Sequence, residues 1–320
     1  MESNTLSAKI IKQAAERLGF TACGMAPAER VAPWQEARVR EWLEEGKNGE
    51  MAYLENNVEM RLDPRLLVPE AKTVVSLALN YYPSEEMAEE GYHFARYAYG
   101  KDYHDVMRRK LRELMQQLGL KEYEDARPFC DTAPVDERYW AWRCGLGWIG
   151  RNTQLIVPRK HGNKLQPAGS YFFLGEIITT REVDQYDSPI ASRCGNCRAC
   201  LDACPTKALT EGGLDARRCL SYLTIEYRGE LSDEIGDLLK DCIYGCDRCS
   251  EACPWNNLAL PNTETDLQPS EEFLSMTQDD WNNLTIEQYR KIFKGSAVKR
   301  AKYEGLTRNI RLAAKKRKEL

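Results

Sequence analysis

The sequence predicts an α+β protein in three parts: a mixed helix-and-strand domain, a small cysteine-rich domain and a helical C-terminal region. Helix and strand patterns alternate through the first part. Nine of the twelve cysteines fall between Cys194 and Cys253, which marks the second part, and a polar linker from Pro261 to Ser270 introduces the third. The predicted domains are therefore residues 1–187, 188–260 and 261–320.

Composition places the chain among ordinary globular proteins. Of its 320 residues, 42% are hydrophobic and 29% charged. Its apolar runs fall short of the roughly 20 residues that a membrane helix needs, and Met1 to Ile10 lacks the basic-then-apolar layout of a signal peptide. We therefore expect a cytoplasmic protein without membrane contact. In a reducing cytoplasm, twelve cysteines indicate metal binding rather than disulfides.

In the first domain, apolar residues at helical spacing predict helices, and short β-branched runs predict strands. Gly19 closes the first helix, and Pro33 and Gly46 bound the second. The expected helices are Thr5–Leu18, Trp34–Glu45, His104–Leu118 and Glu137–Cys144. The expected strands are Thr21–Met25, Thr73–Asn80, Arg127–Cys130, Leu155–Val157 and Ser170–Thr180. Their alternation predicts an α/β or α+β domain of about 185 residues, and we expect the α/β type.

The cysteines of the second domain form two regularly spaced runs, each ending in proline. The runs read Cys194-x-x-Cys197-x-x-Cys200-x-x-x-Cys204-Pro205 and Cys246-x-x-Cys249-x-x-x-Cys253-Pro254. Structural zinc usually takes two C-x-x-C pairs separated by a longer spacer. The pattern here is that of bacterial ferredoxins, and it predicts a ferredoxin-like domain with two [4Fe–4S] clusters.

In two-cluster ferredoxins, the last cysteine of each run binds the other run's cluster. One cluster would then be held by Cys194, Cys197, Cys200 and Cys253, and the other by Cys204, Cys246, Cys249 and one more cysteine. A regular second run would place that cysteine where Ile243 stands. Cys219 and Cys242 both remain candidates, because the insertion between the runs, helical in pattern from Leu231 to Leu239, could bring either to the iron.

Clusters that carry single electrons imply a second redox centre in the first domain. The stretch Gly145 to Gly150 matches a dinucleotide fingerprint, but a helical pattern precedes it where a strand is required, and the position of the expected acid holds Ser170. Glycines in tight turns explain the match better. The chain has three histidines and no D-x-H-x-x-G motif for a corrinoid ligand. His104, at an expected helix start, is as compatible with capping as with catalysis.

Asp131 is the acid that the sequence singles out. It follows the apolar Phe129-Cys130, so we expect it at the end of a strand, where α/β folds place catalytic groups. Desolvation there would raise its pKa and keep it protonated near neutral pH, ready to donate a proton. The structural alternative is an Asx-turn with Thr132 and Pro134.

The C-terminal region is basic although the chain has a net charge of −4. From Lys294 to Leu320, ten Lys or Arg face only Glu304 and Glu319. Such a surface would bind the phosphates of a nucleic acid. A solvated helix face with a frayed end, closing with Lys315 to Lys318, accounts for the charge equally well.

Taken together, these stretches resemble the epoxyqueuosine reductase family, which acts in queuosine modification of tRNA. The resemblance covers nearly the whole chain. It is carried by Arg96 to His104, Asp131-Thr132-Ala133-Pro134-Val135, Glu137-Arg138, Gly145 to Asn152, Gly169 to Glu176, the cysteine runs with Tyr244-Gly245-Cys246-Asp247, Lys299-Arg300 and Arg308-Asn309.

The resemblance implies a cobalamin-dependent iron–sulfur enzyme, related to reductive dehalogenases, that reduces epoxyqueuosine to queuosine at the wobble position of the tRNA anticodon. This is the last step of queuosine biosynthesis. Cobalamin would bind base-off in the first domain, with no protein imidazole on cobalt. Electrons would come from an external low-potential donor through the clusters, and the enzyme would be a monomer.

The resemblance also implies roles for particular residues. Asp131 would be the proton donor, with Tyr103 beside it in the pocket. Cys219 would be the eighth cluster ligand, which leaves Cys242 spare. The implied cobalamin contacts are Arg61, Asp131, Ser221, Cys246 and Asp247.

The chain departs from the family pattern in two places. The insertion Lys160 to Pro167 would lengthen the turn before Gly169 and alter the mouth of the pocket. The C-terminal helical repeats of some members are not present, so the basic end and the catalytic face would hold the tRNA. Candidates to stack on a splayed-out base are Trp140, Trp142 and Trp148, although each also fits a core role.

Two other functions stay open at this point. One is a dehalogenase-like corrinoid reductase acting on a small molecule, which leaves the basic end unexplained. The other is a two-cluster electron-transfer protein without catalysis, which leaves the large first domain unexplained.

Overall fold

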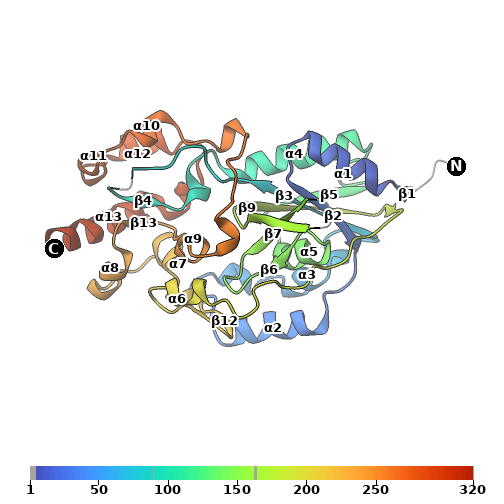
Figure 1. The fold of residues 1–320 in the computed structure, drawn as a ribbon, viewed down its shortest axis with the longest axis horizontal. Helices are drawn as coiled ribbons and strands as arrows, with labels where there is room; N and C mark the ends of the chain where they lie inside the picture. The colour runs from blue at the N-terminus through green and yellow to red at the C-terminus, as the bar shows by residue number, and fades with distance from the viewer. Residues whose placement is uncertain (1–4, 89, 162–163, 320) are drawn as a thin grey trace.

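The computed structural model describes residues 5–88, 90–161 and 164–319. Figure 1 shows an elongated molecule with the N-terminal sheet at one end, the C-terminal helices at the other and the cysteine-rich segment between them. Within the described ranges, no helix combines the length and the apolar character that crossing a membrane requires.

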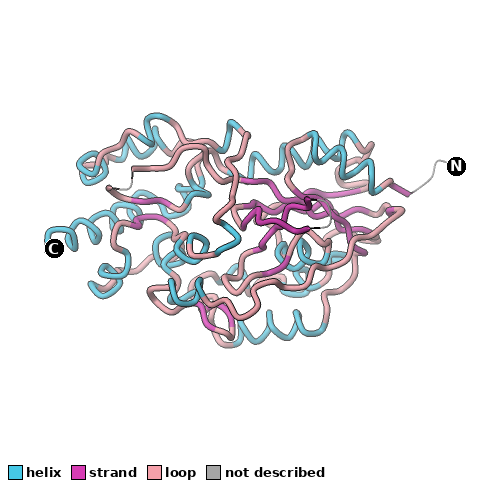
Figure 2. The backbone as a smooth tube through the Cα atoms, in the orientation of Figure 1, coloured by secondary structure: helices cyan, strands magenta, loops and turns pink. Residues whose placement is uncertain are grey.

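A four-stranded sheet in the order β2-β3-β9-β5 forms the centre of the N-terminal part (Figure 2). Its strands are β2 (Ala22–Pro27), β3 (Thr73–Asn80), β9 (Phe172–Thr179) and β5 (Ala126–Phe129). The sequence predicts all four, and β3 has the expected bounds. The α/β-type arrangement is wrong, because every neighbouring pair runs antiparallel, whereas α/β domains join parallel strands through crossover helices. The domain is α+β.

Helices cover both faces of this sheet (Figure 1). On one face lie α1 (Ala8–Arg17) and α4 (Tyr103–Gln117), and on the other lies α5 (Glu137–Arg143). Because both faces are covered, β3 is a nearly unbroken apolar run. A Cβ at Gly175 would lie 2.6 Å from Met107 Cε, so glycine is what lets α4 approach β9 closely.

Smaller elements complete the N-terminal part. They are β1 (Thr5–Leu6), α2 (Pro33–Glu44), α3 (Val58–Leu62), β6 (Trp148–Ile149), β7 (Leu155–His161), β8 (Lys164–Gly169) and β10 (Glu182–Val183). The glycine-rich stretch follows α5, so a helix precedes it, as expected. A Cβ at Gly147 would meet the carbonyl oxygen of Ile156 at 2.0 Å, which explains that glycine by packing.

The insertion at 160–167 belongs to an antiparallel hairpin of β7 and β8 rather than to a longer turn. Residues 162–163 lie outside the described ranges. The neighbouring Arg159 and Ala168 line a cavity separate from the one that contains Asp131. The expected effect of the insertion on the mouth of the pocket stays a prediction.

The cysteine-rich segment is built from very short elements. They are α6 (Ala199–Ala203), β11 (Leu209–Thr210), β12 (Gly213–Leu214), α7 (Leu220–Ile225), α8 (Asp233–Leu239), β13 (Cys242–Tyr244) and α9 (Arg248–Glu251). Helix α8 confirms the expected helix near 231–239. The shortness of these helices means that contacts outside them must hold their geometry.

The C-terminal helices are α10 (Glu271–Leu274), α11 (Gln278–Asn282), α12 (Ile286–Ile292) and α13 (Lys302–Glu319). Their core takes in β4 (His93–Phe94), which pairs in parallel with β13. The ring centroid of Phe94 lies 5.1 Å from that of Trp281 and 5.8 Å from that of Phe293. A segment from the first predicted domain therefore helps to build the C-terminal core, while the linear boundaries at 187 and 260 stay predictions.

Candidate active site

Asp131 lies just past the end of β5, in a left-handed backbone conformation with φ of 54°. Only a few per cent of non-glycine residues adopt this region, and aspartate is among the types that tolerate it. The backbone N–H of Asp131 donates to a carboxyl oxygen of Glu137, at the start of α5. The turn is therefore pinned from the next helix, and the Asp131 side chain is free to face α4.

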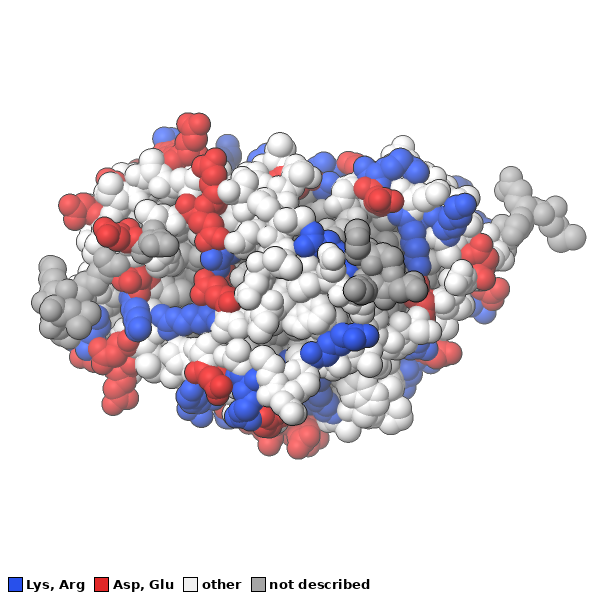
Figure 3. All heavy atoms as spheres, in the orientation of Figure 1, with Lys and Arg blue, Asp and Glu red and all other residues white. Residues whose placement is uncertain are grey.

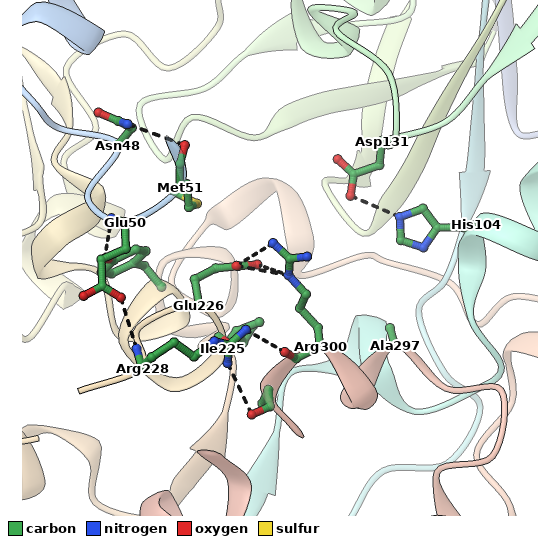
Figure 4. Close-up of polar contacts among 12 residues, drawn as sticks. Asn48, Glu50, Met51, His104, Asp131, Ile225, Glu226, Arg228, Ala297 and Arg300 are labelled. Carbon is green, nitrogen blue, oxygen red and sulfur yellow. Dashed lines mark hydrogen bonds and ion pairs between the residues drawn. The ribbon is translucent and has the colours of Figure 1, made fainter. Parts of the chain in front are cut away.

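The first turn of α4 supplies the partners of the Asp131 carboxylate. The Tyr103 hydroxyl donates to Asp131 Oδ2, and His104 Nε2 lies 3.4 Å from the same oxygen (Figure 4). On its other side, His104 Nδ1 lies 2.5 Å from Oδ1 of Asp102, the residue that caps α4. His104, which the sequence left undecided between capping and catalysis, bridges two carboxylates. Asp131 accepts bonds across the site, which is not the geometry of the Asx-turn alternative.

These contacts reverse the protonation state expected of Asp131. Desolvation pushes its pKa up, as expected, but the hydrogen bonds from His104 and Tyr103 outweigh it and hold the pKa below the usual value. Desolvation lowers the pKa of His104, but the bonds to Asp102 and Asp131 raise it to about 9. At neutral pH, Asp131 is therefore an anion beside an imidazolium, and the prediction of a raised pKa is wrong.

Glu137 has the raised pKa that the sequence analysis assigned to Asp131. Burial and then the charge of Asp131 raise its pKa to about 8. When two coupled carboxyls share a site, the proton stays mainly on the one with the higher pKa. We call Tyr103, His104, Asp131 and Glu137 together the acid wall.

An inner cavity of about 490 Å³ separates the acid wall from the cysteine-rich segment. Its opposite side, here called the cysteine wall, consists of Cys204, Cys219, Ser221, Cys246, Asp247 and Cys249. An outer cavity of about 500 Å³ adjoins it, lined by Arg61 and Trp42 and sharing Asp131 and Glu137 with the inner one. The predicted residues Tyr103, Asp131, Ser221, Cys246 and Asp247 thus surround one space, whereas Arg61 lines the neighbouring space.

All twelve cysteines are free thiols, and those of the two runs gather into two sets. Burial and then Cys253 and Cys194 raise the pKa of Cys200, and Cys194 and Cys197 act in the same way on Cys253. In the second set, burial and then Cys246 and Cys219 raise the pKa of Cys249. Cys200 of the first set also raises the pKa of Cys249, so the two sets lie close together, and the crosswise assignment of ligands stays a prediction.

The eighth cluster ligand could be Cys219 or Cys242, and these two cysteines have different surroundings. The pKa of Cys219 is raised by burial and then by Cys246 and Cys204, so it faces two members of the second set. Cys242 contacts Cys246, and its Sγ donates to the carbonyl oxygen of Gly245 at 2.8 Å. Among the residues described, no three His, Cys, Asp or Glu side chains converge as ligands of a single metal ion would. A cluster differs in taking one thiolate per iron over a larger volume.

Tyr53 and Arg300, here called the rim, form a pair that the sequence did not predict, although Arg300 belongs to the basic end expected to hold phosphates. The Tyr53 side chain is exposed, and the guanidinium carbon of Arg300 lies 5.3 Å from its ring centroid. Glu226 holds Arg300 through two bonds of 2.8 and 2.7 Å (Figure 4). Burial, Glu226 and Asp131 raise the pKa of Tyr53, so the rim lies within electrostatic reach of the acid wall. A lone Tyr and a distant Arg carry no pattern that could have linked them.

The three tryptophans predicted to stack on a base differ in how deeply they are buried. Trp140 and Trp148 are core residues, with 2% and 1% of their surface exposed. Trp142 is half-buried and packs edge-on against Trp34 at 5.5 Å. The core alternative is therefore correct for Trp140 and Trp148.

Much of the basic charge near the C-terminus is used inside the protein. Arg308 is buried and donates to the carbonyl oxygens of Tyr227, Gly229 and Leu223. Lys315 and Lys316 pair with carboxylates of α8 at 2.7 and 2.9 Å. The side chains of residues 317–320 lie outside the description. Figure 3 shows acidic and basic side chains interspersed around the face that it presents. The charge count therefore overstates the basic surface open to phosphates.

Comparison with known proteins identifies relatives over the whole chain. A family model described as "Epoxyqueuosine reductase QueG, DUF1730" matches residues 61–132, and a "4Fe-4S double cluster binding domain" matches residues 193–256. The epoxyqueuosine reductase of Cellulophaga algicola is 42% identical over 97% of this chain and 99% of its own length. That of Escherichia coli is 36% identical over 98% of this chain and 82% of its own.

Solved structures agree with this result. A crystal structure of epoxyqueuosine reductase with an epoxyqueuosine-modified tRNA-Tyr stem loop has a TM-score of 0.82 and 30% identity, and covers 95% of this chain and 80% of that one. A Bacillus subtilis epoxyqueuosine reductase, solved with its aspartate catalytic loop swung out of the active site, has a TM-score of 0.81 at 30% identity and the same coverage.

Proposed function

The chain belongs to the epoxyqueuosine reductase family, and from this premise we propose that it reduces epoxyqueuosine to queuosine at the wobble position of a tRNA anticodon, with electrons relayed through two [4Fe–4S] clusters to cobalamin. The observation that carries this proposal is the inner cavity, where proton-bearing groups face four cysteines across one space. Reductive removal of an epoxide oxygen needs both protons and electrons at one place. An external low-potential donor would supply the electrons to a monomeric enzyme.

The cysteine neighbourhoods support the assignment of the cluster ligands. One cluster would be held by Cys194, Cys197, Cys200 and Cys253, and the other by Cys204, Cys219, Cys246 and Cys249. Repulsion between neighbouring thiolates helps to raise these pKa values, and a bound metal cation would offset that repulsion and stabilise the deprotonated cysteines. Since the second set borders the inner cavity, its cluster would be the one that passes electrons to the substrate site.

Buried polar atoms that lack a protein partner support cobalamin as the occupant of the two adjoining cavities. Asn152 Nδ2 in the inner cavity and Gln35 Oε1 in the outer one are buried, and no described residue bonds them. The edge of the corrin ring carries amide groups that could bond both atoms, and buried polar groups are rarely left unpaired. When bound, cobalamin would supply a reduced cobalt centre able to open the epoxide. Arg61, Ser221, Cys246 and Asp247 line the space around it.

Asp247 is fixed for such a role by Arg96. The backbone N–H of Arg96 donates to Asp247 Oδ2 at 2.8 Å, and its guanidinium is held by Glu86 and Glu251. Burial raises the pKa of Asp247 to about 6 despite Arg96. We infer that Arg96 positions Asp247 against the cofactor.

The acid wall would handle the protons. Tyr103 and His104 hold the Asp131 carboxylate toward the inner cavity, where the epoxide oxygen would sit. Asp131 would pass a proton to that oxygen after taking one from its protonated neighbours. The aspartate catalytic loop of the Bacillus subtilis relative supports a catalytic role for an aspartate in this family.

The rim of Tyr53 and Arg300 would hold the RNA. A loop base splayed out for reaction leaves neighbours that stack on aromatic rings, and Arg contributes through its charge and its flat guanidinium. Both side chains are about half exposed, at 50% for Tyr53 and 51% for Arg300. We therefore expect the anticodon loop to contact this rim.

The test uses protein reconstituted with iron, sulfide and cobalamin under anaerobic conditions. With a low-potential reductant and tRNA carrying epoxyqueuosine, nucleoside mass spectrometry should detect queuosine, and omission of cobalamin should abolish it. Cluster formation without cobalamin uptake would favour an electron carrier. Turnover of halogenated aromatics but not of the tRNA would favour a dehalogenase-like reductase.

A further inference from the structure

The proposed reaction consumes two protons, but the electrostatics of the acid wall leave Asp131, the expected proton donor, ionised. This inference rests on the proposed function. Converting the epoxide to an alkene and water breaks both C–O bonds and takes two electrons and two protons. The electrons come from the low-potential one-electron donor, and both protons end on the departing oxygen. Asp131, held as an anion by Tyr103 and His104, cannot by itself be the resting source of either proton.

Glu137 is the carboxyl that the geometry places beside this anion. It begins α5, accepts the backbone N–H of Asp131 through Oε1, and lines both cavities. Behind it lies Glu176 of β9, fully buried, whose Oε1 accepts from Ser76 Oγ at 3.0 Å. Glu137 thus stands between an exposed carboxylate and a buried carboxyl.

The groups around Glu137 come from every element packed against it. They are Tyr103 and His104 of α4, Cys130 and Asp131 after β5, Asp136 and Arg138 beside it, Glu176 of β9 and Arg61 of α3. The backbone N–H of Asp131, Arg138 and His104 favour the ionised form, but burial and then the charge of Asp131 outweigh them and raise the pKa of Glu137 to about 8. The pKa of Glu176 is also raised, by burial and then by Glu137. Neighbouring carboxyls whose pKa values are pushed apart are a recurrent arrangement for acid–base work.

We propose that Glu137 is the second acid of the active site, which anchors the Asp131 backbone through one carboxyl oxygen and supplies through the other a proton that the reaction consumes. One proton reaches the oxygen as the first C–O bond breaks, and the second reaches it as the oxygen leaves as water. Glu137 supplies the second proton between these events, either directly across the cavity or by way of Asp131. The left-handed turn at Asp131 makes this arrangement possible, because it brings the backbone N–H to Glu137 while the side chain faces Tyr103.

The first test needs neither cofactor nor turnover. Infrared titration of protein labelled with ¹³C-glutamate should show the carbonyl band of a protonated glutamate that disappears with a midpoint near 8. Glu137→Gln should lack this band, and Glu113→Gln, on the exposed side of α4, should keep it. A wild-type protein without such a titrating glutamate, or a Glu137→Gln protein that retains it, would overturn the proposal.

The second test separates proton supply from positioning. Glu137→Gln keeps a carbonyl oxygen for the Asp131 N–H but carries no acidic proton, whereas Glu137→Ala removes both. In the reconstituted enzyme, Glu137→Gln should lower kcat by about 100-fold or more, with KM for the tRNA unchanged and without the wild-type loss of rate as pH rises through about 8. Hydrogen exchange at residues 131–136 should rise only in Glu137→Ala.

The outcomes distinguish this inference from the function on which it rests. A Glu137→Gln enzyme with wild-type kcat and pH profile would reject Glu137 as an acid. Equal loosening of residues 131–136 in both variants would reduce it to an anchor and reject the proposal. If wild-type enzyme makes no queuosine, the proposed function fails, and the carbonyl band still decides whether Glu137 holds the proton.

Discussion

The two walls of the inner cavity differ in what holds them in place. The acid wall stands on α4, β5 and α5, which pack on an antiparallel sheet with an apolar core on each face. The cysteine wall stands on helices of four to six residues and a small apolar cluster around Leu201. Helices this short are not stable alone. The groups of the acid wall are therefore held in place by the fold itself, whereas the proposed electron path would depend on clusters bound by the cysteines.

The largest expected effect lies in the cysteine wall. Cys219→Ser should remove one cluster, so that bound iron falls by about half and turnover is lost, because an iron without its thiolate is labile. Cys242→Ser is the matched control and should keep both clusters. Iron analysis and electron paramagnetic resonance would measure the difference, and the reverse pattern would make Cys242 the ligand. Hydrogen exchange should show the sheet amides of β3 and β9 equally protected in both variants.

The next largest effect is expected in the acid wall, where a substitution should impair catalysis without loss of the clusters or of cobalamin. Asp131→Asn should bind clusters and cobalamin normally and lower kcat by about 100- to 10,000-fold, because asparagine tolerates the left-handed backbone but cannot carry a proton. Asp125→Asn, just before β5, is the control and pairs only with groups far from the cavity, such as Arg181. Loss of iron or cobalamin in Asp131→Asn would show that the two walls are not separable.

A smaller effect is expected at the rim of Tyr53 and Arg300, which would contact the RNA. Tyr53→Ala should weaken tRNA binding by about 1–3 kcal/mol, the usual value of one base stacked on an aromatic ring. Tyr53→Phe keeps the ring and should bind normally. Filter binding at several salt concentrations would measure this. Arg300→Ala should also weaken tRNA binding, because Arg300 packs on the Tyr53 ring, whereas Lys315→Ala, which removes a residue paired with Asp233 and not in contact with that ring, should change little.

The smallest effect is a pH dependence of stability in the acid wall. The folded-state pKa of His104 is raised from 6.5 to about 9, so its stabilising charge is fully present below pH 6.5 and is lost as pH rises through about 9. The upper bound is about 3 kcal/mol. The raised pKa of Glu137 acts in the same direction from pH 4.5 to about 8. Urea unfolding followed by tryptophan fluorescence should therefore show stability falling between pH 6.5 and 9, with a shallower slope in His104→Gln. A flat wild-type profile would contradict the charge assignments.

Several features of this protein could be predicted from the sequence alone. The cysteine spacing, the main strands and helices, and the position of Asp131 after a strand all depend on residues close together in the chain, where periodicity and motif spacing are informative. The motifs also carried the resemblance to epoxyqueuosine reductases, which the relatives and solved structures confirm.

Other features required the tertiary structure, because they depend on pairs that sequence spacing cannot relate. Strand direction in the sheet follows from long-range pairing, so the alternation of helices and strands could not decide between an α/β and an α+β arrangement. Tyr53 meets Arg300 across most of the chain, and β4 meets β13 across nearly half of it. The pKa of Asp131, which follows β5, falls rather than rises because Tyr103 and His104 reach it from α4, and the proton then resides on Glu137. Sequence identifies which groups can titrate or bind metal, whereas their charge states depend on neighbours that only folding brings together.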